Sequence, residues 1–118
     1  MKKNEVKYIK IDSVGVERYT LNGKTHREDG PAYINDIVKE WWIHGRKHRA
    51  DGPAVEYEHG DWIWYEKGRR HREDGPAMKI HGNLSWWLNG KEYSTFDEWL
   101  EALDKPESVK LMLAMKYK

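Results

Sequence analysis

Aromatic residues, turn signals and basic residues follow one another along most of the chain at a fixed period. Four short runs begin with an aromatic residue and reach an X-Gly pair three positions later. They start at Tyr19, Trp41, Trp64 and Trp86, with spacings of 22, 23 and 22 residues. Self-similarity at a fixed period of this size is typical of a repeat architecture.

Within each unit the pattern favours β-strands. Asn-Gly between two such runs is the strongest short-range hairpin signal, because a type I′ turn needs positive φ at both central positions. The pairs at 22–23 and 89–90 are Asn-Gly, whereas those at 44–45 and 67–68 begin with His and Lys and fit less well. A second turn is expected in the other half of each unit, near 58–60 and 80–82 in the later units. Each unit is therefore predicted to supply two hairpin turns.

A two-residue loop fixes which residues of a hairpin face one another. Trp42 is expected opposite Lys47, and Trp41 opposite His48. Stacked hairpins would then form ladders of recurring residues on each face of the sheet. One face would carry Tyr19, Trp41, Trp64 and Trp86 beside His26, His48, His71 and Tyr93, and the other Thr20, Trp42, Tyr65 and Trp87.

The first three units continue with the same run, His-Arg-x-Asp-Gly-Pro-Ala. This set invites a catalytic interpretation, with His as base and Asp as its orienting partner. A catalytic set is needed only once, however, and this one recurs at the same phase of each unit, so a structural role is preferred. We expect the histidine to pack against the aromatic ladder, the aspartate to cap the Gly-Pro turn, and the arginine to pair with a neighbouring unit's carboxylate. The structural residues are His26, His48, His71, Asp29, Asp51 and Asp74, with Trp41, Trp64 and Trp86 in the ladder.

The pattern changes to helical spacing near residue 95. Thr95 and Glu98 form a capping box, and Phe96, Trp99 and Leu103 follow at helical intervals. A repeat array needs its open end covered, so we assign residues 1–94 to the array, with a half-unit at 8–18, and 95–118 to a helical cap. The predicted fold is mainly β: an elongated antiparallel meander of tandem hairpins of about 22 residues with a C-terminal α-helical cap.

Composition limits the class of protein further. The chain has 118 residues, which fits one domain. It has no run of 18 apolar residues, so no membrane partner is expected, and its polar first residues predict no secretory signal. Cysteine is absent, which fits the cytoplasm. Seven Trp and seven Tyr stand beside one Phe, and aromatic residues with a polar group suit half-exposed positions.

Metal binding and nucleic-acid binding are the alternatives to a protein partner. Histidines of successive units would stand roughly 9–10 Å apart, two strand spacings, which is too far to share one zinc ion; we expect no metal and no cofactor. Basic runs at 46–49 and 67–72 lie among aromatics, as in single-strand binding proteins. Between residues 19 and 93, however, 12 Lys or Arg balance 12 Asp or Glu. The neutral array favours a protein partner, with single-stranded nucleic acid as the alternative.

The repeating unit resembles a variant of the MORN repeat, a hairpin repeat of similar length, over roughly residues 8–93. The aromatic residues that open each unit, together with Gly23, Gly45, Gly68 and Gly90, match the family's aromatic and turn glycine. The His-Arg-x-Asp-Gly-Pro-Ala run departs from the standard unit and is similar to repeats of bacterial and bacteriophage proteins. Related variants include antitoxins, so the resemblance implies a small inhibitor of the antitoxin or counter-defence kind.

We therefore expect a binding protein without catalytic residues. Exposed aromatics and arginines dominate protein interfaces. The predicted partner-binding residues are Trp42, Tyr65 and Trp87, flanked by Lys47 and Arg70. The alternative for this face is that the C-terminal helices cover it as core. The partner's identity and the oligomeric state stay open.

Overall fold

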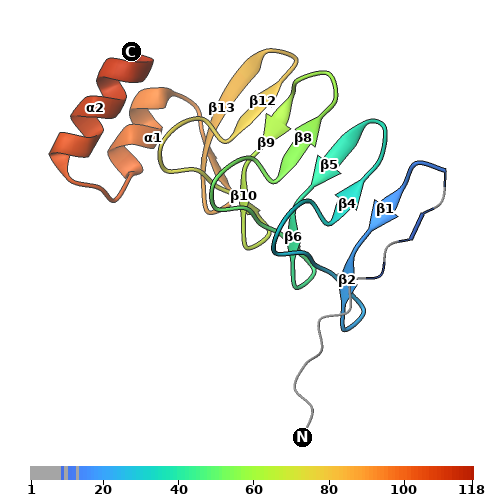
Figure 1. The fold of residues 1–118 in the computed structure, drawn as a ribbon. Coiled ribbons are helices and arrows are strands. Elements are labelled where there is room, and N and C mark those ends of the chain that lie inside the picture. Colours follow the sequence, from blue (N-terminus) through green and yellow to red (C-terminus); the bar gives the residue numbers. More distant parts are fainter. Residues whose placement is uncertain (1–8, 10, 13) are drawn as a thin grey trace, which may run out of the picture.

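The structure is a computed structural model that describes residues 9, 11, 12 and 14–118 (Figure 1). The start of the expected half-unit, and the N-terminal residues from which we predicted no secretory signal, lie outside the described residues. Within the described part, fourteen strands are followed by two helices at the C-terminal end. This arrangement confirms the predicted fold, a mainly β meander of tandem hairpins that ends in helices.

Eight strands form one antiparallel sheet, which we call the long sheet. Its order is β1-β4-β5-β8-β9-β12-β13-β14, so each hairpin lies beside the next in chain order. The strands are β1 (Glu17–Arg18), β4 (Tyr33–Ile34), β5 (Val38–Glu40), β8 (Val55–Tyr57), β9 (Trp62–Ile63), β12 (Met78–Ile80), β13 (Asn83–Leu88) and β14 (Lys91–Tyr93).

A second row of hairpins runs along the other side of the array (Figure 1). With their turns, these four short hairpins comprise residues 20–25, 42–47, 65–70 and 87–92. Backbone bonds join neighbours: the Arg27 N–H donates to the Trp42 carbonyl at 3.0 Å. Their strands are β2 (Thr20–Leu21), β3 (Lys24–Thr25), β6 (Trp42–Ile43), β7 (Arg46–Lys47), β10 (Tyr65–Glu66) and β11 (Arg69–Arg70), with β13 and β14 forming the fourth.

The strand register agrees with the arithmetic of two-residue loops. Trp42 pairs with Lys47 in the β6–β7 hairpin, and the His48 N–H donates to the Trp41 carbonyl at 3.1 Å. At 44–45 and 67–68, the two turns with weaker sequence signals, φ is 47° and 80°, and 52° and 83°. Positive φ at both positions is the type I′ conformation, so these turns match the Asn-Gly turns despite their first residue.

Turns at the outer edge of the long sheet differ in length. Asn35 donates its backbone N–H to the Val38 carbonyl at 3.0 Å, and Ile80 pairs with Asn83, so both turns have two residues between their paired ends. In the middle unit the Tyr57 N–H donates to the Asp61 carbonyl at 2.9 Å across three residues. This extra residue accounts for the spacing of 23 instead of 22.

The alanine that ends each His-Arg-x-Asp-Gly-Pro-Ala run is fully buried. Ala32, Ala54 and Ala77 have no exposed surface. The Ala54 carbonyl accepts a hydrogen bond from the Trp41 N–H at 2.7 Å, and the other two alanines accept equivalent bonds. The run therefore brings the chain back against the aromatic residue that opens its own unit.

The helices α1 (Phe96–Ala102) and α2 (Glu107–Tyr117) pack at the β13–β14 end of the array (Figure 1). Thr95 caps α1 by accepting the Glu98 N–H at 3.1 Å, as predicted. Pro106 is the N-cap of α2 and so lies one position before the helix's first turn. A residue without an N–H is also tolerated in that first turn. The cap core is centred on Trp99, which is fully buried.

Candidate functional site

The histidine of each His-Arg-x-Asp run makes a hydrogen bond to the next unit. His26 accepts the backbone N–H of His44 at Nδ1, at 2.9 Å. His48 and His71 accept the N–H groups of Lys67 and Asn89 in the same way, at 3.0 and 2.9 Å. Each donor is the first residue of the next unit's turn. These histidines thus join one hairpin to the next, a role that the sequence did not predict.

The arginine of the run stacks on the ladder. The Arg49 guanidinium lies 3.8 Å from the centre of the Trp41 ring and donates to the Pro53 carbonyl at 3.0 Å. A Cβ at Gly52 would meet the guanidinium carbon at 2.8 Å, so the Asp-Gly-Pro loop needs glycine to approach it. Equivalent stacking occurs on Tyr19 and Trp64, at 4.1 Å in both.

The aspartate of the run binds the arginine of its own loop. Arg27, Arg49 and Arg72 donate from Nε to Asp29, Asp51 and Asp74 at 2.9, 3.3 and 2.7 Å. Hence the expected pairing with a neighbouring unit's carboxylate is wrong, since the loop doubles back on itself. The expected aspartate cap at the Gly-Pro turn is replaced by this ion pair. The bond from Arg27 lowers the pKa of Asp29 and, reciprocally, raises the pKa of Arg27.

Two open clefts lie between successive loops of this kind. One, of about 790 Å³, is lined by the loops at 48–51 and 71–74 together with Lys105 and Val109 of the cap. Lys105 binds Glu73 there at 3.0 Å, which lowers the pKa of the Glu73 carboxyl. The other, of about 740 Å³, lies between the loops at 27–30 and 48–51. Both clefts are lined largely by side chains that already bind one another.

The predicted partner-binding residues come together on the short hairpins. Lys47 Nζ lies 5.5 Å from the centre of the Trp42 ring and 5.2 Å from that of Tyr65. The Arg70 guanidinium lies 4.9 Å from the centre of the Trp87 ring. All five side chains are half-buried. They form a row that alternates aromatic and cationic groups, which we call the aromatic–cation ladder.

Polar contacts hold two rings of the ladder in place. The indole N–H of Trp42 donates to Glu40 Oε1, and that of Trp87 donates to Ser85 Oγ, both at 2.8 Å. Arg70 differs, because its Nε is buried and has no acceptor among the described residues. A buried donor without a partner is costly, so the Arg70 guanidinium is held by packing on Trp87 and not by hydrogen bonds of its Nε.

The cap covers the other side of the fourth hairpin. Trp86 contacts Phe96, Trp99 and Tyr117, with ring centres 4.9, 4.9 and 5.2 Å apart. Successive residues of a strand point to opposite faces. The neighbouring residue Trp87 therefore faces away from the helices, and the alternative in which the cap covers the ladder is not what the structure shows.

A second inter-unit bond, at the edge of the long sheet, was not anticipated. Asp61 is buried and accepts the backbone N–H of His81 at 2.9 Å, as well as His59 Nε2 at 2.9 Å. The His81 bond and then the His59 bond lower the pKa of Asp61. The only signal for it in the sequence is an aspartate 20 positions before a turn residue, and a lone aspartate in a polar turn is not informative.

Among the described residues, no group of three or more His, Asp or Glu side chains could hold a metal ion. No helix in the described range is long and apolar enough to cross a membrane.

The chain matches no known protein family, no curated protein and no solved structure.

Proposed function

We propose that this protein is a non-catalytic binding protein that recognises another protein through the aromatic–cation ladder. The observation that carries the proposal is the contrast between adjacent residues: Trp86 is packed under the cap, while Trp87 faces away from it. Trp42, Tyr65 and Trp87 recur along the same face of three hairpins. Tryptophan, tyrosine and arginine are the residues that contribute most to protein interfaces.

The setting we propose is a small bacterial or bacteriophage inhibitor of the antitoxin or counter-defence type, acting in the cytoplasm. Its support is the resemblance of the repeating unit to MORN-repeat variants, which is a likeness of sequence pattern. An inhibitor of this kind needs only a rigid surface. The inter-unit bonds of His26, His48 and His71 supply rigidity, because each hairpin is anchored to the next.

Single-stranded nucleic acid is the alternative ligand. Alternating aromatic rings and cations are what sequence-tolerant single-strand binding proteins use. In this chain, however, Lys47 and Arg70 already lie against the rings that bases would need for stacking. The ladder therefore supports a protein interface better than a base-stacking platform.

The test is capture of partners from a bacterial lysate by the intact protein, read by mass spectrometry, with and without nuclease. The chain offers a matched pair of variants: Tyr65→Ala on the ladder and Tyr57→Ala on the long sheet, both half-buried tyrosines. We expect a nuclease-resistant protein whose capture is lost with Tyr65→Ala and kept with Tyr57→Ala. Equal capture by both variants, or capture that nuclease abolishes, would contradict the proposal.

A further inference from the structure

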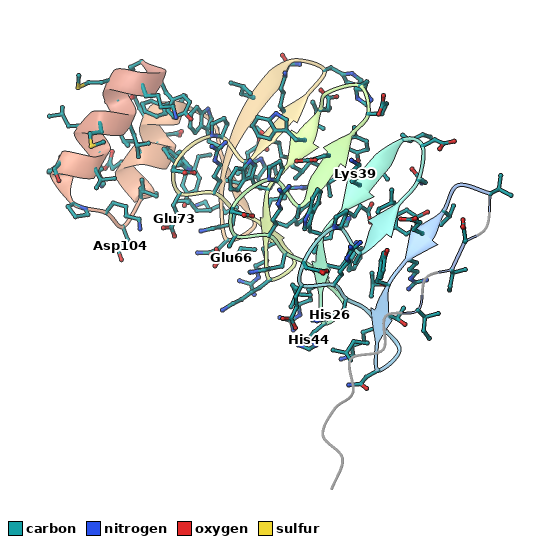
Figure 2. All side chains as sticks on the ribbon, in the orientation of Figure 1. His26, Lys39, His44, Glu66, Glu73 and Asp104 are labelled. Atoms are coloured by element: carbon teal, nitrogen blue, oxygen red, sulfur yellow. The ribbon has the colours of Figure 1, made fainter. Side chains whose placement is uncertain are left out.

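Charge is sorted between the two rows of hairpins, although the repeats are neutral as a whole. The four short hairpins carry seven Lys or Arg residues and two carboxylates. In the long sheet, the segments 33–40 and 55–62 carry five carboxylates and one lysine. One edge of the array is therefore basic, and the other edge is acidic over the first two units. Figure 2 shows the contrasting positions of His44 on a short hairpin and Lys39 on the long sheet.

We propose that the basic edge docks an acidic polypeptide segment of the partner protein. The surface consists of the exposed cations on or beside the short turns, which we call the cationic ridge: Lys24, Arg46, Lys67, Arg69 and Lys91. The inference rests on the proposed function, because it assigns a chemical class to the protein that the neighbouring ladder binds.

The ridge cations differ in their ion pairing from the arginines of the loops. Arg27, Arg49 and Arg72 each bind an aspartate of their own loop. Over the part of the chain that the structure describes, no carboxylate forms an ion pair with any cation of the ridge. Like charges gathered on one edge repel one another. A ligand that brings carboxylates to this edge relieves that repulsion.

Some cations of the ridge lie against the turn of the next unit. A Cβ at Gly45 would lie 3.5 Å from the Lys24 side chain, and one at Gly68 would lie 3.6 Å from that of Arg46. The aliphatic parts of Lys24 and Arg46 thus lie along the next unit's turn. Corresponding cations repeat at roughly 9–10 Å, two strand spacings, and an arginine fork can bind a carboxylate in bidentate fashion.

Two observations favour an acidic polypeptide over a nucleic acid. The ladder rings beside the ridge already carry cations of this chain, so bases have no free stacking platform there. The carboxylates of Glu66 and Glu92 also lie within the short hairpins and are exposed. They would repel a continuous phosphate backbone, whereas a protein segment of mixed charge can place its own lysines opposite them.

The test compares two probes of equal charge, a glutamate homopeptide and a single-stranded oligonucleotide, by fluorescence anisotropy at low and at physiological salt. The intact protein is compared with the ridge variant Arg46→Gln/Arg69→Gln and with the control Lys39→Gln/Lys79→Gln. The control variant has the same net charge as the ridge variant, but its two substitutions lie in the long sheet. Thermal unfolding of all three proteins verifies that the fold is retained.

We expect salt-sensitive binding of the glutamate peptide. The ridge variant should weaken this binding at least about fivefold, and the control should weaken it less than about twofold. Each exposed ion pair contributes only a fraction of the binding free energy, so the losses are modest. Tighter binding of the oligonucleotide than of the peptide would overturn the proposal in favour of nucleic acid. Equal losses in both variants, or no peptide binding at low salt, would also overturn it. Those outcomes leave the Tyr65 and Tyr57 capture comparison intact, so the two proposals fail separately.

Discussion

His26 and His44 are joined by a hydrogen bond in which the side chain of one satisfies the backbone of the other. The donor is the N–H of His44, which sits at φ 47° in a type I′ turn, and the acceptor is His26 Nδ1 at 2.9 Å. Positive φ is uncommon for residues other than glycine. The bond therefore holds in place a turn residue whose own preference for this conformation is weak.

The first prediction concerns this bond in the third unit. His71→Ala removes the acceptor for the Asn89 N–H and empties a buried site, so we expect a loss of about 1–3 kcal/mol in the free energy of unfolding. Urea unfolding measures it. His59→Ala is the control, because that side chain is mostly exposed, and it should change stability much less. Equal losses in the free energy of unfolding of the two variants would contradict a larger contribution from the bond between units.

The second prediction concerns acid stability. The pKa of Asp61 is lowered in the fold, chiefly by the His81 N–H, so its contribution to stability is complete above the unfolded value of about 3.9 and disappears as the pH falls through the lower folded value. Asp61→Asn keeps an oxygen acceptor but removes the charge. We expect its melting temperature to vary less with pH in that acid range than that of the unchanged protein. Parallel pH profiles would contradict this.

The third prediction separates the arginine from the aspartate of one loop. Arg49→Ala removes the contacts with Trp41, Pro53 and Asp51 together and should lower the melting temperature clearly. Asp51→Ala should lower it only slightly, because the Asp51 side chain is 89% exposed and exposed ion pairs contribute little. Differential scanning calorimetry of the two variants tests the order. A larger effect of Asp51→Ala would restore its role as the turn cap.

The fourth prediction concerns the helical cap. Removing residues 95–118 uncovers Trp86, Leu88 and Tyr93, which pack against Trp99 and its neighbours. We expect the shortened chain to aggregate, as measured by size-exclusion chromatography with light scattering. Removal of the last residue, Lys118, is the control and should leave the protein monodisperse if the intact chain is so. A soluble fragment that unfolds cooperatively would show that the helices are dispensable for the array.

Much of the fold could be predicted because it depends on local signals. The X-Gly pairs determine two-residue turns, and these determine that Trp42 faces Lys47. The partner of His26 was not predictable in the same way. It depends on how one hairpin is displaced along its neighbour, and the 18-residue separation from His44 spans a loop whose path the sequence pattern does not define.

The sequence placed the proposed binding residues on one face of the sheet but did not indicate how charge is distributed around them. Lys47 was placed opposite Trp42 from register alone, whereas the contact of Arg70 with Trp87 joins two units and was not predicted. Charge counted over residues 19–93 averages to zero and so conceals the sorting of cations onto the short hairpins. The sorting becomes visible only when charges are assigned to the two rows of hairpins, and that assignment needs the position of both turns in every unit.

The unequal turns at the edge of the long sheet have a consequence for how such proteins can diversify. The middle unit accommodates an additional residue between Tyr57 and Asp61 without altering the adjoining short turn at 67–68, which keeps its two residues and its bond to His48. Insertions and foreign peptide epitopes should accordingly be accepted at the long-sheet turns and rejected at the short ones. One margin of the array is thus open to loop grafting, while the other keeps the register between units.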